Sequence, residues 1–259
     1  MSLHSATSHE QRVVLITGAA GGIGAAIAER YAQAGAAVGL VDSNAVAGEA
    51  LASRLTQAGY LVSFAKADVG RYIECEAACH SIEAVLGPVD TLLNNAGISP
   101  KHAGKPVPIW QMNPVEWQQV LDVNLNSVFN FSRLLTPGMV ERKFGRIVSM
   151  SSVAGKAYLD IVAAHYSTTK AALIGMTRHL AGELGPYGIT VNALAPGRID
   201  TPMVAGAPTA SNDAVIGFTP LGRLGKPSEV ADACLFLTSR QADFITGQVI
   251  DVAGGWLMT

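Results

Sequence analysis

The sequence has few cysteines and no long hydrophobic run, and each absence excludes a class of protein. Its cysteines, Cys75, Cys79 and Cys234, are too few, and odd in number, for a disulfide framework. No run of about eighteen apolar residues is present, so we expect no membrane span. Residues 1–11 are polar and lack the apolar core of a signal peptide, which predicts a flexible N-terminal tail and a cytoplasmic location.

Charged residues are also scarce, and neither sign dominates. They make up 15% of the 259 residues, the net charge is −2, and no long basic run occurs. This composition argues against nucleic acid as a partner. Hydrophobic residues make up 49%, which suits the large core that a chain of this length can bury. No linker-like or repeated stretch occurs, so we expect residues 12–259 to form a single domain.

Strand and helix patterns alternate along the whole chain. Short apolar runs are separated by helical stretches of a dozen or more residues, which end at glycine or proline. The pattern predicts an α/β fold with a doubly wound parallel sheet covered by helices on both faces. Residues 114–131 are typical of one long helix, with a continuation toward Arg142 left open. Residues 98–112 read as a loop, and residues 203–220 as an irregular, lid-like substrate loop.

A glycine-rich turn near the N-terminus is the clearest ligand signal. An apolar strand pattern is followed by Thr17 and then by Gly18, Gly22 and Gly24, which open a helix. Free backbone N–H groups and the positive end of the helix dipole meet at such a point and form an anion site. The alternative is a tight strand–helix connection without a ligand.

Asp42 ends the next predicted strand and narrows the choice of ligand. A carboxylate in this place can accept hydrogen bonds from both hydroxyls of an adenosine ribose, and it repels the extra phosphate of NADP. It therefore favours NAD, although it could instead cap the helix that follows. Further polar or glycine-rich clusters stand at the ends of other predicted strands, where ligands of such sheets bind; they include Asp68, residues 94–97, residues 151–152 and residues 196–197.

A tyrosine and a lysine one helical turn apart form a second candidate site. Tyr166 and Lys170 share one face of a helix predicted over residues 166–184. A free tyrosine is a poor base near neutral pH, and a neighbouring ammonium would stabilise the phenolate and lower its pKa. Ser152 ends an earlier strand and could bond a substrate oxygen beside the phenol. In isolation, a half-buried tyrosine with a surface lysine explains the pair better, and it is the position of Ser152 that favours a catalytic site.

The order of these motifs resembles the short-chain dehydrogenase/reductase family over residues 13–256. The pattern T-G-x-x-x-G-x-G is accompanied by N-N-A-G at residues 94–97 and an N-x-N-like stretch around Asn124. Y-x-x-x-K follows from Tyr166, then P-G-x-I-x-T at residues 196–201. The resemblance implies a single Rossmann-type domain of about seven strands in the order 3-2-1-4-5-6-7.

The resemblance also implies roles for individual residues. Tyr166 would be the general acid/base, Lys170 would hold the nicotinamide ribose and tune Tyr166, Ser152 would orient the substrate oxygen, and Asn124 would anchor a water on a proton relay. Ser152 stands one residue farther from Tyr166 than is common in the family, so one residue is inserted in residues 156–165; Ser151 is the less favoured serine. The implied cofactor-binding residues are Gly18, Gly22, Ile23, Gly24, Asp42, Asp68, Val69, Asn95, Ala96, Gly97, Tyr166, Lys170, Pro196, Gly197, Ile199 and Thr201.

These features predict an NAD(H)-dependent oxidoreductase that interconverts a small-molecule secondary alcohol and its ketone. The first alternative is an NADPH-dependent 3-oxoacyl-[acyl-carrier-protein] reductase. Asp42 disfavours it, and so does Gly182, which stands where those reductases commonly have an arginine that meets the acidic carrier protein. The second alternative is a non-catalytic NAD-binding sensor, which would have no need of the full set of polar site residues.

Several other residues receive weaker interpretations. Cys75 and Cys79 share a helix face, but two thiols favour helix packing over a metal site, and we expect no metal. For His165 we favour a structural role over substrate contact. Lys101, His102 and Arg198 could lie at the pocket mouth and favour an anionic substrate, although a solvated loop charge is the more common explanation for each. The family resemblance finally implies a homotetramer.

Overall fold

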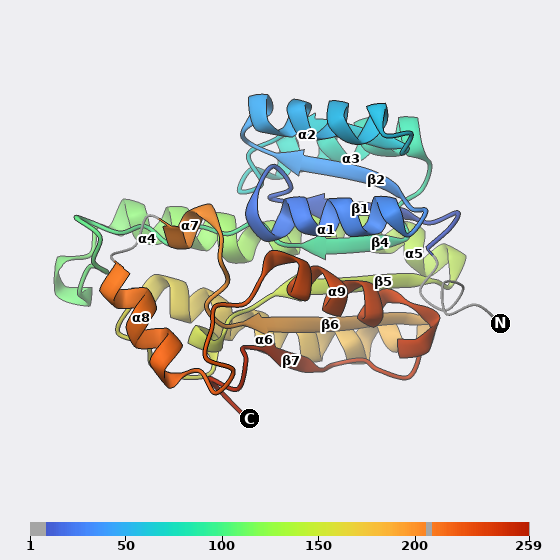
Figure 1. Ribbon diagram of the computed structural model, residues 1–259. Helices are drawn as coiled ribbons and strands as arrows, with labels where there is room; N and C mark the ends of the chain where they lie inside the picture. The colour runs from blue at the N-terminus through green and yellow to red at the C-terminus, as the bar shows by residue number, and fades with distance from the viewer. Residues whose placement is uncertain (1–8, 206–208, 259) are drawn as a thin grey trace.

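The computed structural model describes residues 9–205 and 209–258 (Figure 1). One sheet runs through it, and its strands pair in the order β3-β2-β1-β4-β5-β6-β7, all in parallel. The predicted single-domain α/β fold and its strand order are therefore confirmed. The strands are β1 (Val13–Thr17), β2 (Ala37–Asp42), β3 (Val62–Lys66), β4 (Thr91–Asn94), β5 (Gly145–Met150), β6 (Ile189–Pro196) and β7 (Val249–Val252).

The helices begin and end at residues suited to those positions. The side chains of Asn44 and Asn113 accept backbone N–H groups at the starts of α2 and α4, Pro227 occupies the first position of α9, and Gly87 ends α3 with φ +88°. The helices are α1 (Gly22–Gln33), α2 (Ala45–Gln57), α3 (Tyr72–Leu86), α4 (Pro114–Leu121), α5 (Ser127–Arg142), α6 (Ala164–Leu184), α7 (Pro202–Ala205), α8 (Thr209–Phe218) and α9 (Pro227–Thr238).

Two hydrophobic cores lie on opposite faces of the sheet. Side chains alternate along β1, so Leu15 packs with α3, α5 and α6, whereas Ile16 packs with α1, α2 and α9. Strands β1, β4, β5 and β6 are buried along their whole length, as expected for central strands covered on both faces. The carboxyl ends of all seven strands meet at one edge, next to α7 and α8 (Figure 1).

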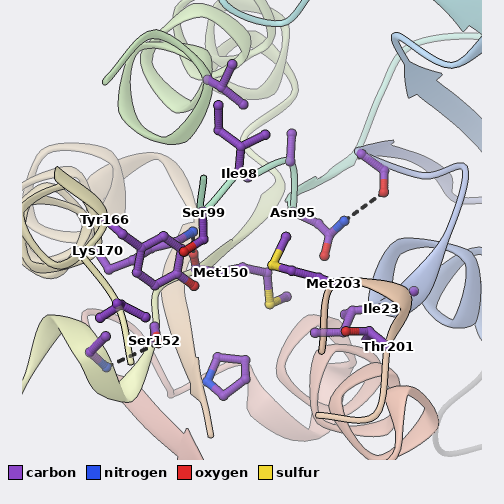
Figure 2. A pocket seen from close by; sticks show the side chains of 18 of the residues that line it. Ile23, Asn95, Ile98, Ser99, Met150, Ser152, Tyr166, Lys170, Thr201 and Met203 are labelled. Carbon is purple, nitrogen blue, oxygen red and sulfur yellow. Dashed lines mark hydrogen bonds between the residues drawn. The ribbon is translucent and has the colours of Figure 1, made fainter. Parts of the chain in front are cut away.

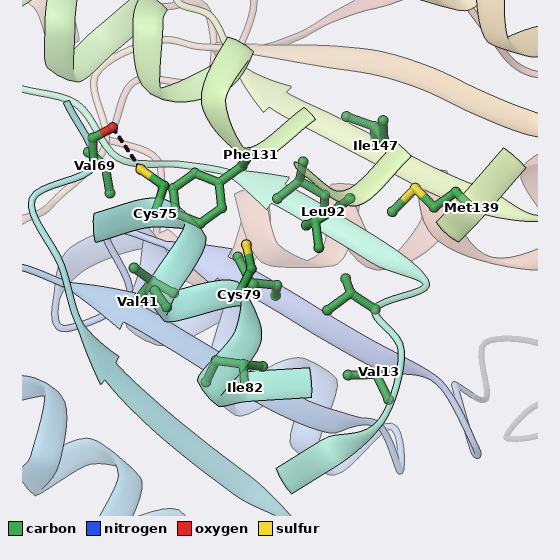
Figure 3. Close-up of a cluster of buried hydrophobic side chains, with 14 of the residues drawn as sticks. Val13, Val41, Val69, Cys75, Cys79, Ile82, Leu92, Phe131, Met139 and Ile147 are labelled. Atoms are coloured by element: carbon green, nitrogen blue, oxygen red, sulfur yellow. Dashed lines mark hydrogen bonds between the residues drawn. The ribbon is translucent and has the colours of Figure 1, made fainter. Parts of the chain in front are cut away.

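The cysteines on α3 belong to the first of these cores (Figure 3). The thiol of Cys75 donates to the Val69 carbonyl, and burial raises the pKa of Cys75 to about 11 and of Cys79 to about 12. Both thiols are therefore protonated near neutral pH and pack as small apolar groups. Within the described residues, no group of three or more metal-ligating side chains comes together.

Two predicted segments differ from the structure. The long helix over residues 114–131 is interrupted by a π-helical turn, Asp122–Asn126, before it continues to Arg142. Residues 203–220 are not an irregular loop, because α7 and α8 occupy most of the described part of this segment. The glycines and Pro208 led to the prediction of a loop although residues 209–218 form a helix. Residues 206–208 lie outside the described residues.

The expected N-terminal tail falls mainly on residues 1–8, which also lie outside the described residues. For residues 9–11 the structure differs from that expectation. His9 is fully buried, its backbone N–H donates to Ala34, and its Nε2 lies 3.0 Å from the Thr238 hydroxyl. Among the described helices, none combines the length and the apolar character that a membrane crossing requires.

Candidate active site

A cavity of about 1360 Å³ lies beyond the carboxyl ends of the strands. This volume exceeds the roughly 300–1,000 Å³ of a pocket for one drug-sized ligand, so it has room for a dinucleotide and a small substrate together. Of the predicted site residues, only Gly24 and Asn124 are not on its wall. The predicted residues that line it are Gly18, Gly22, Ile23, Asp42, Asp68, Val69, Asn95, Ala96, Gly97, Ser152, Tyr166, Lys170, Pro196, Gly197, Ile199 and Thr201.

The glycine turn presents the start of α1 to this cavity. Gly18 and Gly22 have φ values of +62° and +54°, which other residues rarely adopt. A Cβ on Gly18 would also lie 2.7 Å from the Cα of Ala96. Gly21 caps α1 without a side-chain hydrogen bond, so no side chain covers the first N–H groups of the helix. This cradle fits a phosphate group.

Gly24 lies in the first turn of α1, tightly packed against the glycine turn. It does not line the cavity, and a Cβ there would lie 2.1 Å from the carbonyl oxygen of Gly18. Its absence of a side chain lets α1 pack against the end of β1, so it shapes the cradle without reaching into it.

Asp42 is fixed at the neighbouring strand end. Its Oδ2 accepts the N–H of Ala20 and its Oδ1 accepts the N–H of Asn44, each at 2.9 Å. Asn44 is itself the cap of α2, so Asp42 is not the helix cap. The half-buried carboxylate keeps lone pairs toward the cavity, where they fit the hydroxyls of a ribose.

Asn95 joins the end of β4 to the glycine turn. Its side-chain amide donates to the carbonyl of Gly18 at 2.9 Å (Figure 2) and to the carbonyl of Thr17 at 3.0 Å. The Thr17 hydroxyl in turn accepts the N–H groups of Asn95 and Ala96 at 3.0 and 3.1 Å. Thr17 was not among the predicted site residues, although it opens the glycine motif.

Asp68 and Val69 continue the wall beyond β3. The Val69 carbonyl accepts hydrogen bonds from Cys75 and from the amide of Asn130 at 3.1 Å, which fixes the loop. Arg71 also lines this end and pairs with a glutamate on α3; sequence reasoning did not identify it.

Ser152, Tyr166 and Lys170 meet on the opposite wall (Figure 2). Tyr166 lies in the first turn of α6, and Lys170 lies one turn later, with its Nζ 5.5 Å from the phenol ring centroid. The Lys170 ammonium donates to the Met150 carbonyl at 2.6 Å. Tyr166 is hydrogen-bonded to the Ser152 hydroxyl, so both groups face the same point in the cavity.

The pKa of Tyr166 differs from the sequence-based expectation. Burial raises the pKa of the phenol above its ordinary value, and the hydrogen bond from Ser152 lowers it only in part. The Lys170 ammonium is itself buried and donates to the Met150 carbonyl. Burial lowers the pKa of Lys170 to about 8.

The neighbouring Ser151 forms a hydrogen bond to the backbone rather than facing Tyr166. Its hydroxyl donates to the backbone carbonyl of Lys170 at 2.8 Å, which ties the end of β5 to α6. Ser152 caps a 3₁₀ turn by accepting the N–H of Ala154 at 3.1 Å, and its hydroxyl stays within reach of Tyr166. This geometry favours Ser152 over Ser151 despite the unusual spacing.

Asn124 lies behind Lys170 in the π-helical turn and is fully buried. Its side chain both accepts from and donates to the backbone of Ile98, at 2.7 and 2.9 Å. A Cβ on Gly97 would lie 3.4 Å from the Lys170 Nζ and 3.5 Å from the Asn124 Oδ1. The π-turn thus brings Asn124 beside Lys170, as such turns often do near functional sites.

The loop after β6 completes the wall facing α1. The N–H of Gly197 donates to Val252 at 3.0 Å, and Ile199 forms a parallel bridge with Gly225. Thr201 projects toward the glycine turn, since its Cγ2 lies 3.4 Å from the position of a Cβ on Gly22.

Mostly apolar side chains line the rest of the cavity near Tyr166; five of them lie in residues 153–165 and 203–220, which the sequence indicates as substrate-shaping segments, and the others were not identified from the sequence. Met150 directly precedes Ser151 and Ser152 at the end of β5, so the sequence could have indicated its place in the cavity wall. Trp256 lies near the C-terminus, and no local sequence pattern indicates that it reaches the cavity. This group is Ile98, Met150, Leu159, Ile161, Val162, Met203, Val204 and Trp256.

The sequence leaves open whether four basic residues contact substrate, although it favours a structural role for His165. Lys101 and Arg198 line the cavity, whereas His102 and His165 do not. Both histidines contact Glu116 on α4, at 2.7 Å from His102 and 3.3 Å from His165. Their hydrogen bonds hold the pKa of Glu116 below its usual value. The fully buried His165 therefore links α6 to α4.

Comparison with known proteins gives consistent matches over nearly the whole chain. The family model described as enoyl-(acyl carrier protein) reductase matches residues 18–257. An acetoacetyl-CoA reductase of Shinella zoogloeoides is 40% identical over 94% of this chain and 98% of its own.

Two crystal structures from Brucella melitensis, both described as 3-oxoacyl-[acyl-carrier protein] reductases, are also similar. One is 50% identical with a TM-score of 0.94, and the other, which has NAD bound, is 48% identical with a TM-score of 0.93. Each match covers 100% of this chain and 97% of the other. The chain therefore belongs to the short-chain dehydrogenase/reductase family of oxidoreductases.

Proposed function

We propose that the protein is an NAD(H)-dependent oxidoreductase that interconverts a secondary alcohol and its ketone. The observation that carries this proposal is the meeting of Ser152, Tyr166 and Lys170 on a cavity whose other wall is a phosphate cradle. The cavity volume suits a dinucleotide together with a small substrate.

In this proposal, Tyr166 is the general acid/base. A bound nicotinamide cofactor supplies the site that gives or takes the hydride. Tyr166 accepts the hydroxyl proton when the alcohol is oxidised and returns a proton to the oxygen when the ketone is reduced. The Ser152 hydroxyl holds the substrate oxygen beside the phenol. Lys170 positions the cofactor ribose, and the neighbouring Asn124 continues the proton relay from Lys170.

We propose NAD rather than NADP because of Asp42. A fixed carboxylate at the adenosine end suits two ribose hydroxyls and repels a phosphate. Among the described residues that line this end, the basic side chain is Arg71, and Glu74 neutralises it. One of the similar crystal structures is described with bound NAD.

The test is a panel of secondary alcohols and ketones, including hydroxy acids, sugar alcohols, cyclic alcohols and steroids. Turnover is read as the appearance or loss of reduced nicotinamide with NAD(H) and NADP(H) in parallel. We expect turnover with NAD(H). A protein that binds NAD firmly but converts no member of the panel would instead support the alternative of a non-catalytic NAD-binding sensor.

A 3-oxoacyl-[acyl-carrier-protein] reductase remains the second candidate, because similar proteins carry that description. Gly182 counts against it, since it lies exposed on α6 with open space around it, where a carrier-binding arginine is expected. Reduction of an acetoacetyl thioester on carrier protein with NADPH, faster than any reaction with NADH, would favour this candidate.

We also propose a homotetramer in the cytoplasm. Val115 on α4 and Phe129 on α5 are 75% and 53% exposed, and subunit contacts would cover such apolar groups. Light scattering at micromolar concentration tests the assembly, and a stable monomer would contradict it.

A further inference from the structure

We propose that Lys101 and Arg198 form an anion-binding subsite in the substrate half of the cavity, so that the alcohol or ketone carries a carboxylate or phosphate. This inference rests on the proposed oxidoreductase function and specifies its substrate class. The negative group would bind between the two side chains while the carbinol or carbonyl oxygen lies at Ser152 and Tyr166.

The strand order brings the two cations to the site that holds Ser152. Lys101 follows β4 and Arg198 follows β6, and these strands flank β5, which ends just before Ser152. Both side chains line the same cavity as Tyr166. Residues nearly a hundred positions apart in the sequence therefore face one substrate volume.

Neither cation has an acidic partner among the described residues. Arg198 donates from its Nε and Nη2 to the Oδ1 of Asn212, at 3.0 and 2.8 Å. Asn212, which lies on α8, is neutral, so it orients the Arg198 guanidinium without cancelling its charge. The other N–H donors of the guanidinium are left to bind an anion. By contrast, Arg223, which also lies in a loop, pairs with Glu229.

Burial makes two unpaired cations unfavourable for folding. Desolvation lowers the pKa of Arg198, and desolvation together with the charge of Arg198 lowers the pKa of Lys101. The two groups therefore lie close enough to repel each other. A bound anion would remove both penalties, which is the expected arrangement for a charge-assisted binding site.

Charge is also divided between the two halves of the cavity. The acidic residues that line it, Asp42, Asp68 and Asp122, lie around the ends of β2 and β3. The N–H of Gly70 donates to Asp68, and a Cβ on Gly70 would lie 3.1 Å from the Cβ of Asp122, so these two carboxylates are near each other. Lys101 and Arg198 lie at the β4 and β6 ends, so the substrate half is positive. An anionic substrate is attracted to this half and repelled from the adenosine half.

Binding of oxo acids to the cofactor-saturated protein tests this inference without turnover, since a ketone with oxidised cofactor cannot be reduced. Calorimetry would compare pyruvate, acetoacetate and levulinate with their methyl esters, and dihydroxyacetone phosphate with dihydroxyacetone. We expect at least one anion to bind about tenfold or more tightly than its neutral counterpart, the scale of a charge-assisted hydrogen bond. The preferred member identifies carboxylate or phosphate.

Matched variants locate the effect. Arg198→Gln and Lys101→Gln should each weaken the anion about tenfold or more and leave the neutral counterpart unchanged, while Arg198→Lys should retain part of the preference. Lys105→Gln removes the same charge from the same loop but outside the cavity wall, and it should change nothing.

Equal binding of anions and neutral counterparts, or no binding of any anion, would overturn the subsite. So would an equal loss in Lys105→Gln. Failure of the proposed function is separately visible, because it requires that no alcohol or ketone is turned over, whether charged or neutral. Turnover of neutral substrates alone would keep the oxidoreductase and remove the anion subsite.

Discussion

Replacing Asp42 by asparagine removes one charge from the adenosine end of the cavity and keeps the shape of the side chain. A hydrogen bond to a charged group contributes about 1.5–3 kcal/mol, so NADH should bind roughly 10- to 150-fold more weakly. The side-chain oxygens of Asp42 accept two backbone N–H groups, and asparagine offers only one oxygen, so unfolding should become easier by about 1 kcal/mol.

Fluorescence titration with NADH and NADPH measures this change in specificity. Wild-type protein should prefer NADH, and Asp42→Asn should reduce or reverse that preference as the repulsion of the 2′-phosphate disappears. Glu49→Gln removes the same charge from the exposed surface of α2 and should leave the ratio unaltered. Tighter binding of NADPH by the wild-type protein, or an unchanged ratio in Asp42→Asn, would refute the reasoning.

Three further predictions concern stability and pH. Gly24→Ala should destabilise the fold by about 3 kcal/mol because its Cβ overlaps the Gly18 carbonyl, whereas Gly182→Ala, in open space on α6, should be neutral or stabilising in thermal unfolding. Ser152→Ala should move the Tyr166-dependent inflection in the pH–rate profile to higher pH, because it removes the bond that lowers the pKa of the phenol; a downward shift would contradict this. Since Lys170 has a pKa of about 8 in the folded protein and an ordinary value when unfolded, the wild type should gain up to about 3 kcal/mol relative to Lys170→Met as pH rises through about 8 to 10.5. Unfolding by urea at several pH values measures that gain, and a constant difference would contradict it.

The sheet and much of the site could be predicted because their signals are local. Each strand is a short apolar run, and each site segment follows directly after one, so the parallel topology places them at one edge. Asp42 and Ser152 needed no more than this rule. The pairing of Tyr166 with Lys170 needed only the helical period.

Other features depend on contacts that no local pattern records. The π-helical turn adds one residue to a helix whose hydrophobic period barely changes, so Asn124 looked like part of a regular helix. The direction of the Lys170 ammonium depends on the Met150 carbonyl, which belongs to a different element. The approach of Lys101 to Arg198 depends on the order of three strands.

Helix α8 and Gly24 illustrate the limits of composition and motif. Glycine and proline around residues 203–220 suggested an irregular loop, yet the segment between them is helical. Gly24 fits the motif of a cofactor contact, but the space it leaves is filled by the Gly18 carbonyl. A glycine in a ligand motif can thus serve the packing of the protein itself.

The role of Tyr166 is tested most directly by Tyr166→Phe, which removes a single oxygen from the cavity wall. Cofactor affinity and turnover should be measured on the same preparation with the best substrate of the panel. We predict unchanged cofactor affinity and a turnover lower by about 10² or more, the contribution of one general acid/base. Wild-type turnover in this variant would contradict the assignment of Tyr166 as the proton-transferring group.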